Sequence, residues 1–203
     1  MSNIWDERYA SEEYFYGKKP NVYLKEKLEE IPKGKILLPA DGEGRNGVYA
    51  ASIGWETFAF DSSEEAMKKA KALAAQQKVG IHYDCIDVES AKYKKNSFDV
   101  LALIYTHFPP AKRKEYHQKL ASFIKPNSML VIEGFSKKQM DYQKDNPFAG
   151  GPKNVDMLYD LEEIKSDFDG FEFIEAKEKE VDLAEGKNHL GKSSVIRILA
   201  KKR

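Results

Sequence analysis

The sequence contains one cysteine, Cys85, so no disulfide can form within its 203 residues. No apolar run approaches the roughly 18–20 residues that span a bilayer, and residues 1–8 are polar, unlike a signal peptide. Lys and Arg total 33, as do Asp and Glu, which argues against nucleic-acid binding through a bulk positive field. We therefore expect a cytoplasmic globular protein that binds neither membranes nor nucleic acid.

Clusters of metal ligands are also missing. His82 and Cys85 lie close together in the sequence, but no second cysteine or histidine cluster accompanies them, and a structural zinc site needs such ligands. We therefore expect no metal site. Of the other histidines, His117 is expected to face solvent from the middle of a helix. His189 could reach an acceptor pocket, but a role in a turn is favoured.

Apolar segments of strand length alternate with segments of helical periodicity along most of the chain. This alternation is typical of a doubly wound, Rossmann-like α/β sheet, here of about seven mostly parallel strands. The last two strands have no helix between them, which predicts an antiparallel hairpin at the sheet edge. We expect one domain over 1–203, with an N-terminal cap or lid at 1–31 and an α/β core at 35–203. The expected strands are 36–38, 57–60, 81–86, 98–104, 128–132, 171–176 and 193–200.

Several expected helices begin with capping signals. Asn21 precedes one apolar-periodic stretch and Asp160 another, while Ser62 opens an S-x-x-E capping box that ends at Glu65. Glycine and proline mark residues 144–152 as a surface loop. Because ligands of a doubly wound sheet bind at the C-terminal ends of its strands, candidate site residues should follow each strand directly.

A glycine-rich loop follows the first expected strand. Residues 42–47 read G-x-G-x-x-G and open a helix, as in dinucleotide-binding loops. Asp61 follows the second strand, where an acid can bind a ribose diol; its alternative is a helix cap. Asp87 follows the third strand and can accept a hydrogen bond from adenine, with Val88 against the ring; its alternative is a solvated loop acid. Nicotinamide dinucleotides and S-adenosylmethionine (SAM) both contain adenosine, so these acids fit either.

The negative charge of the loop favours SAM over a nicotinamide dinucleotide as the ligand. A pyrophosphate is an anion that sits at a helix N-terminus, and the carboxylate of Glu43 between the glycines would oppose its approach. SAM has no phosphate and carries a sulfonium cation, so Asp41 and Glu43 are tolerable beside it. An NAD(P)-dependent oxidoreductase remains the alternative interpretation of the same loop.

These residues resemble a known family. The loop Gly42-Glu43-Gly44-Arg45-Asn46-Gly47, with segments 5–9, 14–21 and 185–191 and Phe98-Asp99, is similar to class I SAM-dependent methyltransferases. More narrowly, it resembles their small bacterial tellurite-resistance type. The resemblance implies methyl transfer from SAM to a small-molecule acceptor, with S-adenosylhomocysteine (SAH) as the product. Leu38 and Ala40 stand where the family usually has an acid and a glycine, so a non-catalytic SAM-binding protein is a further alternative.

The fold and the resemblance together assign roles to particular residues. His107 follows strand 98–104, where the transferred methyl group should point. It is the candidate general base because histidine titrates near neutral pH, but a role in lining the pocket is favoured. The loop 146–156 and the N-terminal segment would close over the acceptor and exclude water. The implied cofactor residues are Asp41, Gly42, Glu43, Gly44, Arg45 and Asn46 for the methionyl part, Asp61 for the ribose with Ser62 beside it, Asp87 and Val88 for the adenine, Ile104 and Tyr105 through their backbone, Arg8 for the methionyl carboxylate, and Tyr16 and Gly17 from the N-terminal segment.

Overall fold

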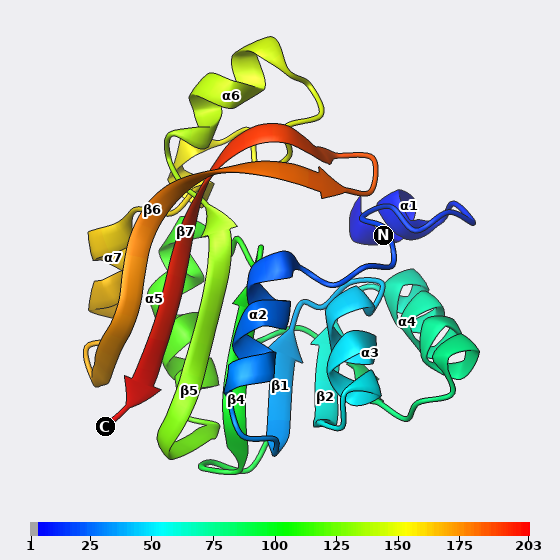
Figure 1. The fold of residues 1–203 in the computed structure, drawn as a ribbon, viewed down its shortest axis with the longest axis vertical. Coiled ribbons are helices and arrows are strands. Elements are labelled where there is room, and N and C mark those ends of the chain that lie inside the picture. Colours follow the sequence, from blue (N-terminus) through cyan, green and yellow to red (C-terminus); the bar gives the residue numbers. More distant parts are fainter. Residues whose placement is uncertain (1–3) are drawn as a thin grey trace.

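The computed structural model describes residues 4–203 and contains a seven-stranded sheet with helices on both faces (Figure 1). The strand order is β3-β2-β1-β4-β5-β7-β6. Strands β1 to β5 run parallel, whereas β7 is antiparallel to both β5 and β6. The strands are β1 (Lys35–Pro39), β2 (Glu56–Asp61), β3 (His82–Cys85), β4 (Phe98–Ile104), β5 (Ile124–Phe135), β6 (Phe171–Glu185) and β7 (His189–Lys202). The predicted fold class, including its C-terminal antiparallel pair, is confirmed.

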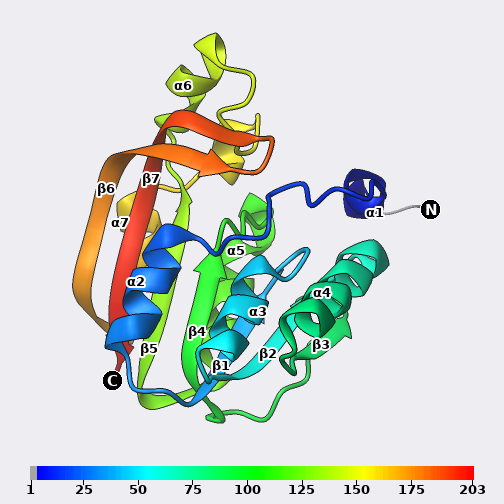
Figure 2. The same ribbon diagram turned by 45° about the vertical axis from the view of Figure 1, so that its right-hand side comes forward.

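The helices connect the parallel strands and cover the sheet. They are α1 (Ile4–Tyr9), α2 (Val22–Glu30), α3 (Arg45–Ser52), α4 (Glu64–Gln77), α5 (Pro110–Ala121), α6 (Gln139–Asp145) and α7 (Leu161–Asp167), with the 3-10 helix η1 (Val155–Met157). Helices α2, α3 and α4 cover one face, and α5 and α7 cover the other (Figure 2). Residues 1–3 of the expected N-terminal segment lie outside the described residues.

The central strand β4 has both faces buried. Val100 and Ala102 pack with the α2–α3–α4 layer, whereas Leu101 and Leu103 pack with the α5–α7 layer. Side chains of a strand alternate between its two faces, so an unbroken apolar run is required here. This confirms the interpretation of 98–104 as a central parallel strand.

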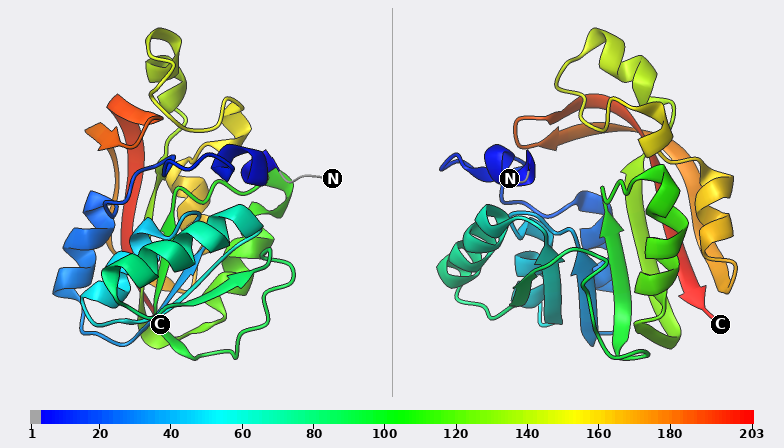
Figure 3. Two further views of the ribbon diagram at one scale, coloured as in Figure 1. Left: turned by 90° about the vertical axis from the view of Figure 1, so that its right-hand side faces the viewer. Right: turned by 180° about the vertical axis from the view of Figure 1, so that it is seen from behind.

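The last two strands are longer than predicted. Strands β6 and β7 pair from Phe171 opposite Lys202 to Glu185 opposite His189, and their outer halves extend beyond the helical layers toward α1 (Figure 3). Those halves are polar because one face of a two-stranded ribbon meets solvent, so they carry no apolar strand signal. Helix α6 (Gln139–Asp145) was not predicted, and it packs on β7.

Most of the predicted helix starts are confirmed. The side chain of Asn21 accepts a hydrogen bond from the backbone N–H of Leu24, and that of Asp160 caps α7. The cap of α4 is Ser63 rather than Ser62, since Ser63 Oγ accepts from the Ala66 N–H at 3.1 Å.

The expectation that His117 faces solvent was wrong. Its side chain is fully buried, because α7 covers this side of α5. The imidazole Nδ1 lies 2.8 Å from a carboxylate oxygen of Asp167, and the ring stacks on Phe168. His117 therefore holds α5 against α7 and has no access to a ligand.

The residue after β1 gives a prediction about stability. Ala40 has a φ of 51°, in the left-handed region, where an L-residue with a Cβ costs about 1–2 kcal/mol. Ala40→Gly removes that cost but gives the unfolded chain more freedom, worth about 0.4–1 kcal/mol. We expect a net stabilisation of about 0.5–1 kcal/mol, measured by urea unfolding without ligand. A destabilised variant would contradict this; Gly42→Ala (φ 58°) should lose stability instead.

Candidate active site

A cavity of about 650 Å³ opens at the C-terminal ends of β1, β2, β3 and β4, a volume typical of small-molecule sites. The N-terminal segment, the loop 147–153 and the turn between β6 and β7 complete its walls. The topology thus brings together segments from both ends of the chain. The predicted site residues that line it are Arg8, Tyr16, Gly17, Asp41, Gly42, Glu43, Arg45, Asn46, Asp61, Ser62, Asp87, Val88, Ile104, Tyr105 and His107.

Gly44 is the predicted cofactor residue that does not line the cavity. It caps α3 with a φ of 84°, and a Cβ built on it would lie 2.6 Å from the Cβ of Ala70 in α4. Gly44 therefore allows the loop to turn and α3 to approach α4. It acts on the shape of the site rather than on a ligand.

Two buried acids hold the glycine loop. Asp61 at the end of β2 accepts hydrogen bonds from the backbone N–H groups of Gly42, at 3.1 Å, and Ser63, at 3.0 Å. Asp41 accepts from the N–H of Gly47 at 3.0 Å, so it fixes the loop where Leu38 cannot. Burial raises the pKa of both carboxyl groups, that of Asp41 to about 8.

Glu43 does not present a free charge to the cavity. Its carboxylate is buried and lies 2.8 Å from the Lys69 ammonium of α4, and it accepts from the backbone N–H of Tyr16 at 3.4 Å. The ion pair with Lys69 offsets the negative charge on which the predicted repulsion of a pyrophosphate depends, whereas the bulk of the Glu43 side chain between the glycines remains. The residue ties the loop to α4 and to the N-terminal segment.

Asp87 and Val88 lie at the far side of the cavity from this network. Val88 is buried in the main apolar core, whereas Asp87 is exposed and accepts from the Ser90 backbone N–H at 2.7 Å. The hydrogen bonds from Ser90 lower the pKa of Asp87. Its carboxylate is therefore ionised at neutral pH and reachable from the cavity.

The N-terminal segment covers the strand ends. Arg8 lies between the rings of Trp5 and Phe15, at 4.7 and 5.4 Å from their centroids, and donates to the Tyr16 hydroxyl at 3.1 Å. At the turn of the β6–β7 hairpin, Gly186 approaches the backbone of this segment so closely that a Cβ would lie 2.3 Å from the Phe15 carbonyl oxygen. Hairpin and segment thus form one cover.

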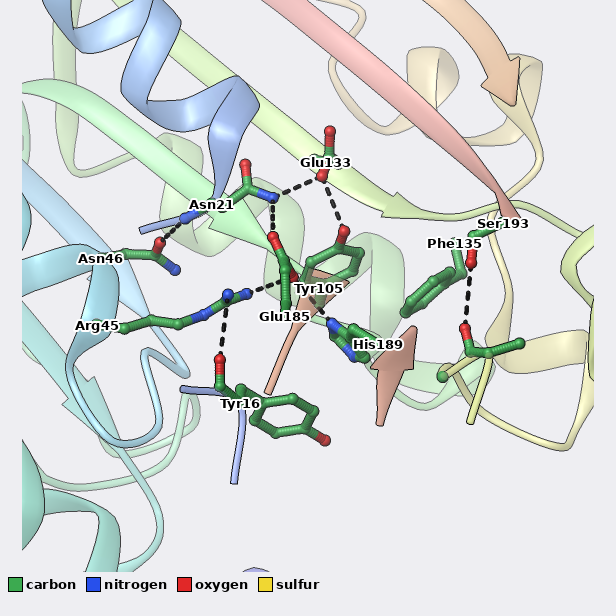
Figure 4. A network of polar contacts seen from close by, with 12 residues as sticks. Tyr16, Asn21, Arg45, Asn46, Tyr105, Glu133, Phe135, Glu185, His189 and Ser193 are labelled. Carbon is green, nitrogen blue, oxygen red and sulfur yellow. Dashed lines mark hydrogen bonds and ion pairs between the residues drawn. The ribbon is translucent and has the colours of Figure 1, made fainter. Parts of the chain in front are cut away.

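A buried polar network fastens this cover to the body (Figure 4). Arg45 of α3 lies 2.9 Å from the Glu185 carboxylate at the hairpin end, and Asn46 accepts from the backbone N–H of Asn21 at 2.9 Å. Asn21 Nδ2 donates to Glu133 of β5 and to Glu185. The two predicted loop residues Arg45 and Asn46 thus have protein partners as well as a place in the cavity wall.

His107 lines the cavity, as favoured, and does not fit the candidate role of general base. Its Nδ1 lies 3.0 Å from the Met157 carbonyl oxygen, and its Nε2 accepts from the Phe135 backbone N–H at 3.1 Å. Both ring nitrogens are therefore occupied, because an N–H at Nδ1 leaves the lone pair on Nε2 for Phe135. Burial lowers the pKa of His107 to about 3. The residue joins β4, β5 and η1 and lines the cavity with its ring.

A second histidine, His189, also belongs to the cavity wall. His189 at the start of β7 lines the cavity and is buried, and its Nδ1 lies 3.1 Å from Glu185 Oε2. The favoured turn role was wrong, because β7 begins at His189 itself. The available signal was an acid four residues before a histidine in an otherwise polar hairpin.

The described residues 4–203 contain neither a cluster of metal ligands nor a helix of membrane-spanning type. No group of three or more His, Cys, Asp and Glu side chains among them is arranged to hold a metal ion. Within the same residues, no helix is long and apolar enough to cross a membrane.

The chain is similar to known methyltransferases in sequence and in fold. Residues 36–127 match the family model described as a methyltransferase domain. A structure from a study of the conversion of a disulfide bond into a thioacetal group during echinomycin biosynthesis has a TM-score of 0.76 and 16% identity, over 98% of this chain and 91% of that one. No curated protein matches the sequence.

Two further solved structures, both of named proteins, are similar to this chain. A SAM-dependent methyltransferase from Methanosarcina mazei has a TM-score of 0.71 and 17% identity, over 90% of this chain and 98% of that one. TehB from Haemophilus influenzae has a TM-score of 0.70 and 17% identity, over 89% of this chain and 61% of that one. At such identities the likeness concerns the fold, whereas the family model concerns the sequence. Residues 36–127 thus match a methyltransferase domain in sequence, and the chain shares its fold with structures of SAM-dependent methyltransferases.

Proposed function

We propose that this chain transfers a methyl group from SAM to a small-molecule acceptor held in the same cavity. The observation that carries the proposal is the convergence of the glycine loop, Asp61 and Asp87 on one cavity, from three successive strands. Its volume of about 650 Å³ suits a nucleoside-sized cofactor together with a small second ligand. When bound, SAM supplies the methyl group on a sulfonium; the chain supplies binding, orientation and exclusion of water.

The cavity wall fits the parts of SAM. Asp61 ends β2 with a buried carboxylate that has lone pairs beyond those used by Gly42 and Ser63, and it can accept from both ribose hydroxyls. Asp87 can accept from the adenine amino group beside the apolar surface of Val88. Gly42 lets the loop pack under the N-terminal segment, because a Cβ there would lie 2.9 Å from the Tyr9 hydroxyl.

The methyl-donor end of the cavity is aromatic. Tyr16, Tyr105 and Phe135 line it, and aromatic faces attract a cation such as a sulfonium. Closure of the N-terminal segment over this end orients the acceptor and removes water from the path of an in-line displacement. The substrate is therefore proposed to be small enough to lie under this cover.

The arrangement of Asp41 disfavours the oxidoreductase alternative. A dinucleotide pyrophosphate binds the free N–H groups at the N-terminus of the helix after the glycine loop. Here the buried carboxyl group of Asp41 already accepts from the Gly47 N–H in the first turn of α3. A pyrophosphate would have to displace it. The non-catalytic alternative predicts cofactor binding without turnover, which activity measurements distinguish.

A thermal-shift comparison of SAH, SAM and NADH tests the cofactor class. A ligand at about 100 times its Kd adds about 2.7 kcal/mol, or on the order of 5–10 °C in Tm for a chain of this length. We expect this shift with SAH and SAM and none with NADH. A shift with NADH alone would contradict the proposed function and favour the oxidoreductase.

A further inference from the structure

A carboxylate and a histidine face each other across the turn of the β6–β7 hairpin. Glu185 ends β6 and His189 begins β7, and the two residues are register partners. His189 Nδ1 lies 3.1 Å from Glu185 Oε2, and both side chains are less than a tenth exposed. Arg45 approaches the same carboxylate oxygen at 2.9 Å, so the orientation of Glu185 is fixed from a second element.

This contact determines which ring nitrogen carries the proton. Burial raises the pKa of Glu185, but its hydrogen bond with His189 and the charge of Arg45 outweigh burial and lower that pKa to about 2. An ionised carboxylate only accepts hydrogen bonds, so Nδ1 of His189 must be the donor. A neutral imidazole then has its lone pair on Nε2. Among the described residues, no hydrogen-bond partner reaches that Nε2.

The ring of His189 lies at the aromatic, methyl-donor end of the cavity. Its centroid lies 4.6 Å from those of Tyr16 and Tyr105 and 5.0 Å from that of Phe135. Tyr105 follows β4 directly and has a φ of 56°, an unusual conformation that aims its ring across the strand ends and is typical of functional sites. Figure 4 shows His189 among these rings, with Glu185 between His189 and Arg45.

We propose that His189 is the general base of methyl transfer and that Glu185 is its positioning residue. This inference rests on the proposed function. As the bond from the methyl carbon to the acceptor atom forms and the sulfur–methyl bond breaks, Nε2 takes the proton of the acceptor and SAH leaves neutral. The imidazolium is stabilised by Glu185 and returns its proton to water after product release. The base that His107 cannot supply is thus supplied from the hairpin.

The surroundings of His189 also indicate the class of acceptor. A base is needed only if the acceptor arrives protonated, and the three rings around His189 offer no cation to an anionic substrate. The two guanidinium groups nearby are already engaged: that of Arg45 pairs with Glu185, and that of Arg8 lies against the rings of Trp5 and Phe15 and donates to the Tyr16 hydroxyl. We therefore assign a small hydroxyl or thiol compound, un-ionised when it binds, rather than an oxyanion.

Kinetics with a graded series of acceptors test this assignment. Thiols and phenols of increasing pKa are compared by SAH release with wild-type protein and His189→Gln. We expect His189→Gln to lower kcat about 10²–10⁴-fold for acceptors that are un-ionised at the assay pH, and to change it little for those already ionised. A loss that is equal across the series, or no loss, would overturn the proposal.

An NMR measurement needs no acceptor. In ¹⁵N-labelled protein saturated with SAH, the His189 signals (those lost in His189→Gln) should report a protonated Nδ1 and an unprotonated Nε2. Glu185→Gln should disturb this tautomer, because its amide can donate to Nδ1. A protonated Nε2 in the wild-type complex would overturn the proposal.

A matched control variant distinguishes an error in the proposed function from an error in the assignment of His189 as the base. His82 is an exposed histidine of β3, stacked on Phe58 and outside the cavity. His82→Gln should keep kcat, SAH affinity and the His189 signals. His189→Gln should keep SAH affinity as well. If wild-type protein fails to bind SAH, the proposed function is wrong; if it binds and turns over while His189→Gln is equally active, only the assignment of the base is wrong.

Discussion

Replacing Asp61 with asparagine should weaken the binding of SAH by at least about 100-fold. Each hydrogen bond to a charged group contributes about 1.5–3 kcal/mol, and every 1.4 kcal/mol is tenfold in Kd. The proposed contact joins the Asp61 carboxylate to both ribose hydroxyls, and Asp61→Asn removes the charge and one acceptor. Isothermal titration calorimetry of the wild type and the variant measures the difference.

Asp61 also holds two backbone N–H groups, so a control must separate lost contact from a disturbed loop. A 2′,3′-dideoxy analogue of SAH lacks the hydroxyls that Asp61 is proposed to bind. The wild type should bind this analogue weakly, and Asp61→Asn should weaken it little further. An equal loss for SAH and the analogue would mean that Asp61 acts on the loop alone, and unchanged SAH binding would refute the assignment.

Asp84 provides the matched acid. It is exposed on β3, one strand from Asp61, and accepts from the Tyr93 hydroxyl at 3.0 Å outside the cavity. Asp84→Asn should leave SAH affinity unchanged. If it weakens binding as much as Asp61→Asn, the effect reflects net charge around the cavity rather than a specific contact.

The sequence predicted those site residues whose position in the fold follows from their place directly after a strand. An acid at the end of a parallel strand must lie at the C-terminal edge of the sheet. The location of Asp61 and Asp87 in the cavity wall could therefore be predicted without any tertiary contact. The glycine loop likewise followed from its place after β1. Gly44 shows the limit of this argument, because the motif does not say which glycine meets the ligand and which meets α4.

The parts that were missed depend on pairs of residues far apart in the chain. Tertiary packing creates the ion pairs of Glu43 with Lys69 and of Arg45 with Glu185. No periodicity in the sequence indicates such pairs. His107 illustrates the same point: its position after β4 was predicted, but its availability as a base depended on Met157 and Phe135. Sequence position therefore located the cavity, while hydrogen-bond partners decided the chemistry of each residue.

The second large effect is expected at Glu133, which lies in β5 and is fully buried. Its Oε2 lies 2.5 Å from Arg197 Nε, and its Oε1 accepts from Asn21 Nδ2 at 2.6 Å and from the Tyr105 hydroxyl at 2.9 Å. Glu133→Ala leaves a largely buried guanidinium and two buried donors without their acceptor. Breaking a buried ion pair in this way costs about 3–5 kcal/mol.

Urea unfolding of ligand-free protein should therefore show Glu133→Ala less stable by about that amount, and its Tm should fall by on the order of 10 °C.

A double variant distinguishes the loss of one partner of the ion pair from the loss of both partners. In Glu133→Leu combined with Arg197→Met, no charge is left unpaired, and apolar replacement of a buried pair is often neutral. The double variant should recover much of the lost stability but not the contacts to Asn21 and Tyr105, which join the N-terminal cover and the aromatic end of the cavity to β5. A single variant as stable as the wild type would mean that water reaches Arg197 in solution and that this network does not hold the cover in place.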